Sequence, residues 1–403
     1  MGKKGVLIAL VVMLFCGKCQ PVWAVPSLEI NGKAAVLLDA NTKQVLYEKN
    51  KDEKLPPASI TKILTVIIAI ESGKMNDTVT VSANPPLLDG TRVYLEEGEK
   101  VKVGRLAIAA LVHSANDAAL AIAEYLGGTE ENFARIMNEK AREIGAQNSN
   151  FVNAHGLHAD DHYTTAYDIG LIACYAMQNE TFRKIAQMKT YDWNGQAWQT
   201  RLINKNQLLW SYDGCTGIKT GYTKEAKCTI AASAERDQRS LIAVSLACVG
   251  NNSWTDAKTL LDYGFNNFQN LEIANPEQVA ARVQVEEDKE LLLVPERALA
   301  ISVPQGSYQK VESRVMLEPF NKQVNKGQVS GKMEFYLDGE RVGAVNLIAQ
   351  NSLTVSSRSI FEYFLFGIAG IYLCQITWRL YRRYRPRKRG MFSRGRHSRA
   401  LFR

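Results

Sequence analysis

The chain has 403 residues, of which 46% are hydrophobic and 22% are charged, and its formal net charge is +8. Residues 25–378 carry a net charge of −6 once the 3 lysines of residues 1–24 and the 11 basic residues of residues 379–403 are set aside. The central part has no run of Lys and Arg interleaved with aromatic residues, so no nucleic-acid partner is expected.

Residues 1–24 are predicted to be a signal peptide. Lys3 and Lys4 precede an apolar core at residues 5–15, and small residues lie before a cleavage site that we place after Ala24. The rest of the chain is therefore expected to be exported.

Residues 26–270 are predicted to form one α+β domain. Runs at residues 34–39 and 44–48 predict an opening hairpin, and residues 59–184 are largely helical in pattern. Residues 214–219, 227–234 and 239–249 predict three consecutive strands. Strands at both ends indicate an antiparallel sheet completed by both termini of the domain, with helices packed on its faces.

A lysine lies inside the apolar run of residues 58–70, three residues after a serine. Pro56 and Pro57 stop any earlier element, and the pattern then predicts a helix with Ser59 and Lys62 on one face. Burial should lower the pKa of the Lys62 amine, so that it could accept the proton of the Ser59 hydroxyl. Ser-x-x-Lys alone is weak evidence, because the spacing occurs by chance in many helices.

Two later motifs strengthen the prediction that Ser59 and Lys62 form a catalytic pair. Ser-Ala-Asn at residues 114–116 lies between two helix-like stretches, and Lys-Thr-Gly at residues 219–221 lies in a β-like segment. In this order after Ser-x-x-Lys, they match the three elements of penicillin-binding proteins and serine β-lactamases.

With these motifs the chain resembles the low-molecular-weight D-alanyl-D-alanine carboxypeptidases, the serine penicillin-binding proteins of peptidase family S11. The resemblance covers about residues 26–270. It extends through four further segments, which are residues 155–157, 163–168, 206–210 and 217–223. It implies a penicillin-binding/β-lactamase-like transpeptidase domain that removes the terminal D-alanine of peptidoglycan stem peptides, takes part in cell-wall maturation and is acylated by β-lactam antibiotics.

The resemblance also implies a catalytic role for three residues. Ser59 would attack the carbonyl between the two D-alanines, Lys62 would be its base, and Ser114 would pass the proton to the leaving amine. No residue in the sequence is identified as the activator of the water that hydrolyses the acyl-enzyme.

The remaining motif residues are expected to bind the substrate. Asn116 would hydrogen-bond the peptide and orient Lys62, while Lys219 and Thr220 would hold the terminal carboxylate. Gly221 would let the substrate backbone approach, and the backbone N–H groups of Ser59 and Tyr222 would stabilise the oxyanion.

Residues 275–350 are predicted to form a small all-β domain, because short alternating runs are separated by Pro, Gly and charged turns. A spacer above the membrane and a module that binds cell wall or another protein are both compatible with this pattern.

Residues 360–378 are predicted to be a transmembrane helix, followed by a basic cytoplasmic tail at residues 379–403. The alternative is an amphipathic helix lying in the membrane interface. In either case the catalytic domain is expected at the cell membrane, on its extracytoplasmic side.

The exported cysteines Cys174, Cys215, Cys228 and Cys248 allow three complete disulfide pairings, among which we favour the contact between Cys228 and Cys248 across a hairpin. His155, His158 and His162, with two neighbouring aspartates, are spaced poorly for a metal site. Neither a metal nor a cofactor is expected, since no phosphate-binding or dinucleotide motif occurs.

Two alternative functions share the serine and lysine pair. A membrane-anchored serine β-lactamase of class A would need a glutamate to activate water, but no Glu-x-x-Leu-Asn segment lies between Asn116 and Lys219. A penicillin-sensing protein would need a cytoplasmic output domain, and only a short basic tail follows residue 378. A non-catalytic wall-binding scaffold would not need all three motifs.

Overall fold

The computed structural model describes residues 28–250, 252–286, 289–305, 311–319, 323–337 and 339–354. The predicted signal peptide, transmembrane helix and basic tail lie outside these residues. None of the helices built from the described residues is both long and apolar enough to cross a membrane.

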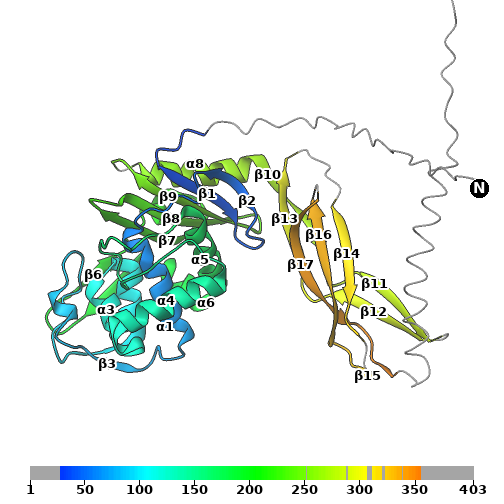
Figure 1. The fold of residues 1–403 in the computed structure, drawn as a ribbon, viewed down its shortest axis with the longest axis horizontal. Coiled ribbons are helices and arrows are strands. Elements are labelled where there is room, and N and C mark those ends of the chain that lie inside the picture. Colours follow the sequence, from blue (N-terminus) through cyan, green and yellow to red (C-terminus); the bar gives the residue numbers. More distant parts are fainter. Residues whose placement is uncertain are drawn as a thin grey trace, which may run out of the picture. The chain divides into compact units, whose positions relative to one another are not determined.

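A five-stranded sheet brings together residues 34–49 and residues 215–248, which lie far apart in the sequence, as Figure 1 shows. The strand order is β2-β1-β9-β8-β7. The bounds are Ala34–Asp39 for β1, Val45–Lys49 for β2, Cys215–Thr223 for β7, Lys227–Arg236 for β8 and Arg239–Cys248 for β9. The opening hairpin, the three later strands and the closure of the sheet by both ends of the domain are therefore confirmed.

The segment between β2 and β7 is mainly helical, as predicted. Its helices are α1 (Lys62–Glu71), α2 (Val103–Ile108), α3 (Asn116–Gly127), α4 (Glu130–Ile144), α5 (Ala166–Gln178), α6 (Glu180–Ala186) and α7 (Leu208–Ser211). Two small hairpins interrupt them, β3 (Thr78–Thr80) with β4 (Lys100–Lys102) and β5 (Thr190–Asn194) with β6 (Gln199–Ile203). A last helix, α8 (Ser253–Asn267), follows β9.

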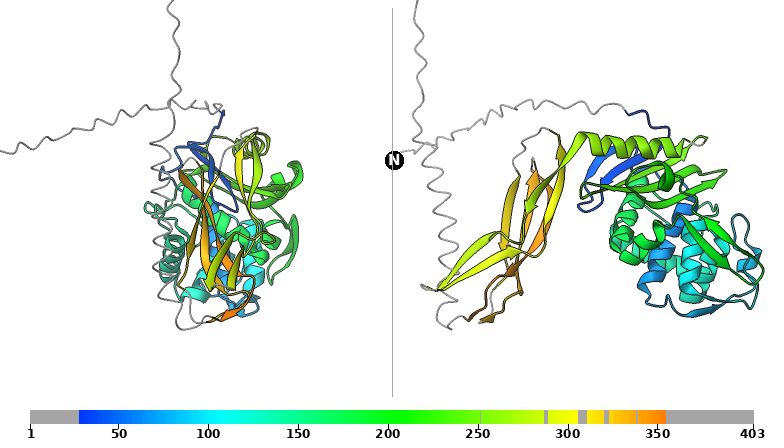
Figure 2. Two further views of the ribbon diagram at one scale, coloured as in Figure 1. Left: turned by 90° about the vertical axis from the view of Figure 1, so that its right-hand side faces the viewer. Right: turned by 180° about the vertical axis from the view of Figure 1, so that it is seen from behind.

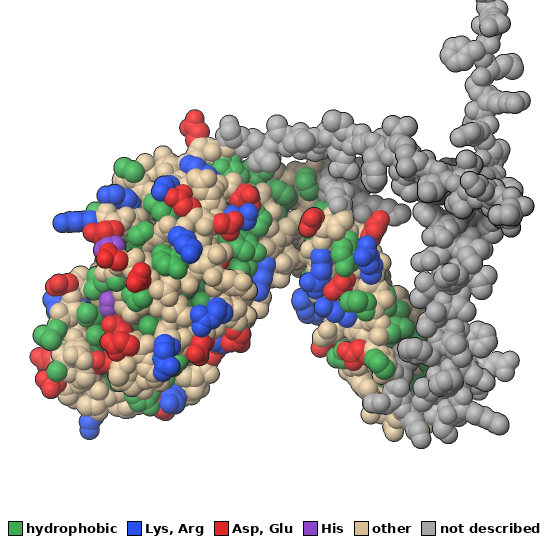
Figure 3. All heavy atoms as spheres, viewed as in Figure 1, with side chains coloured by type: hydrophobic (Ala, Val, Ile, Leu, Met, Phe, Trp, Pro, Cys, Tyr) green, Lys and Arg blue, Asp and Glu red, His purple; other side chains and the backbone are tan. Residues whose placement is uncertain are grey.

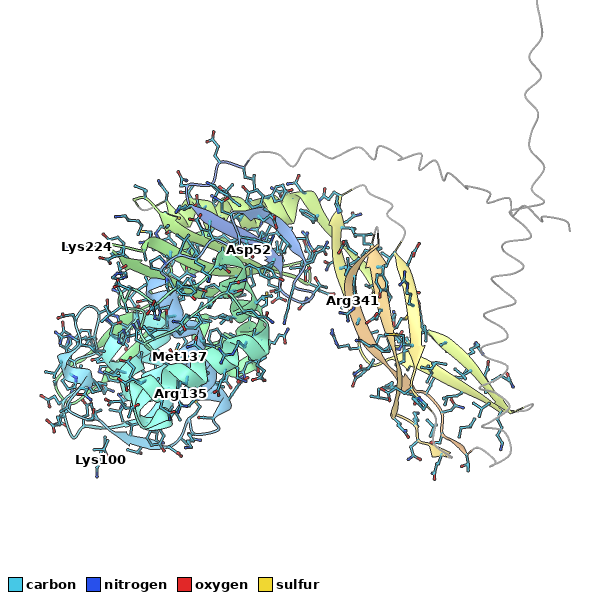
Figure 4. The ribbon with its side chains drawn as sticks, in the orientation of Figure 1. Asp52, Lys100, Arg135, Met137, Lys224 and Arg341 are labelled. Carbon is cyan, nitrogen blue, oxygen red and sulfur yellow. The ribbon has the colours of Figure 1, made fainter. Side chains whose placement is uncertain are left out.

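Helix α1 lies at the centre of this helical layer, where it contacts α2, α3, α4 and α5. Eight of its ten residues are buried, which explains why its sequence is apolar on every face. Helix α4 has the opposite character, since Met137 is buried while Arg135 is exposed (Figure 4). The central position of α1 places the predicted nucleophile at the N-terminal end of a rigid, fully packed element.

Local sequence signals set the ends of the outer helices. Thr129 caps α4 by accepting a hydrogen bond from the Asn132 amide, and Gly145 ends it in a left-handed conformation with φ of 103°. Thr165 caps α5 in the same way through the Asp168 amide. Gly145 and Thr165 therefore fix the two ends of the loop of residues 145–165, which carries His155 and Gly156 of the site described below.

The chain divides into two compact units. The first contains Tyr47–Ala232 and Ala243–Asp262 and includes every candidate site residue. Asp256 of α8 accepts hydrogen bonds from the backbone of Asn31 and Gly32 at 2.8 and 2.7 Å, which ties this helix to the segment before β1. On the face in Figure 3, basic and acidic side chains of this unit are interspersed.

The second unit contains the hairpin ends 37–46 and 233–242 and the chain from Tyr263 onward. Its strands are β10 (Phe268–Ala274), β11 (Ala281–Glu286), β12 (Lys289–Pro295), β13 (Leu299–Pro304), β14 (Glu312–Leu317), β15 (Gln323–Val324), β16 (Val329–Leu337), β17 (Glu340–Ala349) and β18 (Leu353–Thr354). The largest sheet has the order β11-β12-β17-β16-β14, and Figure 2 shows it from two sides. Leu291, Leu293 and Leu347 form its core. The predicted small all-β domain is confirmed.

The favoured disulfide is wrong. Cys228 and Cys248 are both free thiols, although they lie on neighbouring strands. The Cys248 Sγ is buried 3.0 Å from the Ser245 hydroxyl and 3.2 Å from the Asp256 carboxylate. Burial raises the pKa of the Cys248 thiol to about 12, so it behaves as a small packed side chain rather than a reactive one.

Candidate active site

The serine and lysine of the first motif lie within contact distance, as their spacing predicted. Ser59 belongs to the 3₁₀ turn η1 (Ala58–Thr61), and Lys62 is the first residue of α1. The Ser59 Oγ is 3.0 Å from the Lys62 Nζ. Ser59 is partly exposed, while Lys62 is fully buried, so a ligand can reach the hydroxyl while water is excluded from the amine.

The environment of Lys62 favours the neutral amine. Burial, followed by repulsion from Lys219, lowers the pKa of Lys62 well below its usual value, and the attraction of Asp117 only partly opposes this. The Lys62 Nζ lies 2.7 Å from the Asn116 Oδ1 and 2.5 Å from the His155 backbone oxygen. Both atoms can only accept hydrogen bonds, so they use the two hydrogens of a neutral amine and leave its lone pair for the Ser59 hydroxyl.

Asn116 is held in the orientation that this arrangement needs. Its Nδ2 donates a hydrogen bond to the Asp89 backbone oxygen at 2.7 Å, so its Oδ1 faces Lys62. Gly90 follows with φ of +85°, and a Cβ there would lie 2.9 Å from the Asn116 Nδ2. A side chain at residue 90 would therefore displace Asn116 from Lys62.

The second motif sits where a helix begins. Ser114 ends the π-helical turn Ala109–His113 in a left-handed conformation with φ of 72°, and Asn116 starts α3. The buried carboxylate of Asp117 accepts hydrogen bonds from the backbone amides of Val93 and Leu95 at 3.1 Å. Asp117 thus fastens the loop that carries Asp89 and Gly90 to the start of α3.

The third motif lies on β7, which packs against η1. Lys219 is buried, and its Nζ donates a hydrogen bond to the Thr220 backbone oxygen at 2.8 Å. A Cβ on Gly221 would lie 2.7 Å from the Ser59 backbone nitrogen, so only glycine allows β7 to approach the nucleophile this closely. The Tyr222 side chain is 65% exposed, and Tyr222 directly follows Gly221 on β7.

Burial, followed by repulsion from Lys205, lowers the pKa of Lys219 to about 7. This lysine therefore changes charge near neutral pH, whereas an exposed lysine would stay cationic. A bound anion would favour its protonated form.

Comparison with known proteins agrees with this geometry. Residues 21–249, more than half of the chain, match the family model for D-alanyl-D-alanine carboxypeptidase of peptidase family S11, and residues 268–354 match the C-terminal domain of penicillin-binding protein 5. The chain belongs to the D-alanyl-D-alanine carboxypeptidase family. It is thus a serine-type hydrolase of cell-wall metabolism with a penicillin-binding/β-lactamase-like transpeptidase fold.

Individual relatives of this carboxypeptidase cover most of its length. D-alanyl-D-alanine carboxypeptidase DacF of Bacillus subtilis (strain 168) is 33% identical over 319 residues, which span 76% of this chain and 82% of the relative. The crystal structure of penicillin binding protein 5 from Haemophilus influenzae is 29% identical, covers 81% of this chain and 98% of its own, and has a TM-score of 0.69. A mutant of the Streptomyces K15 DD-transpeptidase is 27% identical, covers 59% of this chain and 99% of its own, and has a TM-score of 0.57.

Sequence reasoning missed two backbone groups in the carboxypeptidase site. The carbonyl of His155 contacts Lys62, and the carbonyl of Asp89 fixes Asn116. Every residue has a backbone carbonyl, so no side-chain pattern in the sequence could predict that these two carbonyls would bind Lys62 and Asn116. The resemblance did extend through residues 155–157, and that was the only signal available for His155.

The histidines that were weighed as metal ligands contact protein groups instead. The His155 Nε2 lies 3.2 Å from Glu130, and the His162 Nε2 lies 2.9 Å from the Thr61 hydroxyl. The described residues hold no cluster of His, Cys, Asp or Glu arranged to bind a metal.

Replacing Lys219 with alanine should raise the KM of the carboxypeptidase for its peptide and lower kcat/KM by about 10- to 100-fold, the value of a charge-assisted hydrogen bond. Only protonated Lys219 can pair with a carboxylate, so wild-type kcat/KM should also fall as pH rises through about 7. Steady-state kinetics from pH 5 to 9 would test both effects. An unchanged KM in Lys219→Ala would place the carboxylate elsewhere.

The matched control for this prediction is Lys224→Ala. Lys224 is an exposed lysine that directly follows β7 (Figure 4). Lys224→Ala should leave KM unchanged, and kcat/KM should fall above about pH 7 as it does in the wild type. A similar loss in both variants would mean that general positive charge, rather than Lys219, attracts the substrate.

Proposed function

We propose that this carboxypeptidase hydrolyses the terminal D-Ala-D-Ala bond through an acyl-enzyme on Ser59. The Ser59 Oγ attacks the carbonyl carbon while its proton moves to Lys62. The C–N bond then breaks, and the leaving amine of D-alanine takes a proton through Ser114. Water hydrolyses the ester, which releases the shortened peptide and restores the Ser59 hydroxyl.

The observation that supports this proposal most directly is the set of hydrogen-bond partners around the Lys62 amine. Two pure acceptors at 2.7 and 2.5 Å take the amine hydrogens, and the third direction leads to the Ser59 hydroxyl at 3.0 Å. After proton transfer, the same three oxygens would accept the three hydrogens of the ammonium, so the site suits both protonation states of the amine. A buried amine facing two carbonyl oxygens and one hydroxyl is suited to accept a proton.

The substrate-binding roles follow from β7. Protonated Lys219 and the Thr220 hydroxyl would bind the carboxylate of the terminal D-alanine, and Asn116 would hydrogen-bond the peptide. The close approach of Gly221 to the Ser59 nitrogen supports an oxyanion site between the N–H groups of Ser59 and Tyr222. β-Lactams carry a comparable amide and carboxylate, which would direct them to the same groups.

The topology proposal comes from the sequence. Residues 1–24 would direct export, residues 360–378 would anchor the chain in the cell membrane, and the basic tail would stay in the cytoplasm. The catalytic domain would then face the cell wall. Release of the protein from membranes after truncation at residue 359 is expected, and a truncated form that stays membrane-bound would contradict the anchor.

The function is tested by mass spectrometry of the products formed by the purified full-length chain, in detergent, from a stem pentapeptide. Loss of one alanine is expected. Crosslinked dimers as the main product would instead make the protein a transpeptidase, and rapid turnover of penicillin with an intact pentapeptide would make it a β-lactamase.

A further inference from the structure

The turn that carries the nucleophile is in an unfavourable conformation. Ala58, which precedes Ser59, has φ of +52°, although alanine has a Cβ and rarely adopts the left-handed region. Such a residue costs about 1–3 kcal/mol and persists only where its surroundings hold it. The contacts around Ala58 therefore decide whether Ser59 stays in place.

Three contacts hold this turn. The Thr61 hydroxyl donates a hydrogen bond to the Ala58 carbonyl at 2.9 Å, and the Thr229 hydroxyl of β8 donates one to the Pro57 carbonyl at 2.9 Å. Gly156 packs directly on the Ala58 carbonyl, since a Cβ there would lie 1.9 Å from the oxygen. The Thr61 contact is the one made from within the turn itself.

The Thr61 hydroxyl is in turn oriented by His162. The His162 Nδ1 accepts a hydrogen bond from the Val152 amide at 3.1 Å, so the ring proton must be on Nε2. That Nε2 lies 2.9 Å from the Thr61 Oγ1 and donates to it. The hydroxyl hydrogen of Thr61 is thereby left for the Ala58 carbonyl, and the chain of donors runs in one direction from Val152 to Ala58.

The surroundings of His162 keep this tautomer fixed. The side chain is 2% exposed, and Phe151 packs edge-on against the ring at 5.7 Å between centroids. Burial, followed by repulsion from His155, lowers the pKa of His162 to about 3. The ring thus stays neutral at pH values well above 3, and its Nδ1 remains available to accept the hydrogen bond from the Val152 amide.

We propose that His162 is a positioning residue for the nucleophile, which acts through Thr61 to hold the left-handed turn at Ala58 and so presents the hydroxyl and backbone N–H of Ser59. The inference rests on the proposed role of Ser59. His162 is buried and acts on Ser59 through Thr61, so its effect should appear in the rate of acylation rather than in substrate binding.

The test measures the acylation rate constant with a fluorescent penicillin, together with kcat and KM for the pentapeptide, in the full-length chain. His162→Leu and Thr61→Val should each slow acylation by about 5- to 50-fold with KM nearly unchanged. The double variant should be no slower than the slower single variant, because both break one chain. His162→Gln and Thr61→Ser keep a donor and an acceptor and should restore most of the rate.

The matched control is Thr65→Val. Thr65 lies one turn further along α1, and its hydroxyl donates a hydrogen bond to the Ala154 carbonyl at 2.6 Å without contacting Ala58. This variant should lower the melting temperature about as much as Thr61→Val but leave acylation close to wild type. Equal slowing in Thr65→Val, or multiplicative slowing in the double variant, would overturn the proposal.

Hydrogen–deuterium exchange separates this inference from the proposed function. Amides of residues 55–62 should exchange faster in His162→Leu and Thr61→Val than in wild type or Thr65→Val. Unchanged exchange and acylation in His162→Leu would refute the role of His162. Faster exchange in a protein that never releases D-alanine would refute the proposed reaction while leaving the positioning role intact.

Discussion

Replacing Ser59 with alanine is expected to abolish both the release of D-alanine and covalent labelling by penicillin. The Ser59 Oγ is the partly exposed hydroxyl that faces the buried Lys62 amine at 3.0 Å, and alanine has no atom that could form the acyl bond. Losing a nucleophile typically costs at least about 10⁴-fold in rate. Product analysis and gel fluorescence after incubation with labelled penicillin would measure both activities.

The control for Ser59→Ala lies at the other end of the same helix. Ser72 is exposed, and its hydroxyl donates a hydrogen bond to the Ala69 carbonyl and accepts one from the Lys74 amide, both at the C-terminal end of the helix and away from Lys62. Ser72→Ala should therefore keep full activity and full labelling. Residual penicillin labelling of a folded Ser59→Ala protein would show that another group is the nucleophile.

Replacing Lys62 with either arginine or methionine is expected to lower acylation by about 10²- to 10⁴-fold, the usual contribution of a general base. Arginine would place a permanent cation at this position, because its guanidinium stays protonated in proteins. Methionine fills a similar volume without any base. If acylation is slow in both variants, the function of Lys62 is to accept a proton rather than to supply positive charge.

The two variants need a measure of folding, because Lys62 is fully buried. Lys62→Met leaves the Asn116 Oδ1 and the His155 carbonyl without their donor, which should cost about 1–3 kcal/mol of stability. Circular dichroism and thermal unfolding would show that each variant remains folded at the assay temperature. Near-wild-type acylation by a folded Lys62→Arg protein would rule out the base mechanism.

The sequence predicted the parts of the fold and site that depend on local spacing. The distance between Ser59 and Lys62 follows from one turn of helix, and the hairpins at both ends of the sheet follow from alternation and turn residues. The last strand of the site was predicted too short, since β7 continues to Thr223. Polar and glycine residues at its end resemble a turn, whereas pairing with β8 and packing against η1 keep them extended.

Long-range contacts could not be predicted from spacing. The Asp89 and His155 carbonyls reach Asn116 and Lys62 across 27 and 93 residues of sequence. His162 reaches Thr61 across 101 residues, so its role could not be inferred from its neighbours in sequence. The disulfide prediction failed for the same reason, because the direction of the Cys248 side chain depends on Asp256 in α8.

The most direct test of the account is to map the penicillin adduct by mass spectrometry. Trypsin should release residues 55–62 as one peptide, which contains two hydroxyl residues, Ser59 and Thr61. Tandem fragmentation of the labelled wild-type chain is predicted to place the whole added mass on Ser59. An adduct on Thr61, on the peptide that contains Ser114, or on no peptide at all would contradict the assignment of Ser59 as the nucleophile.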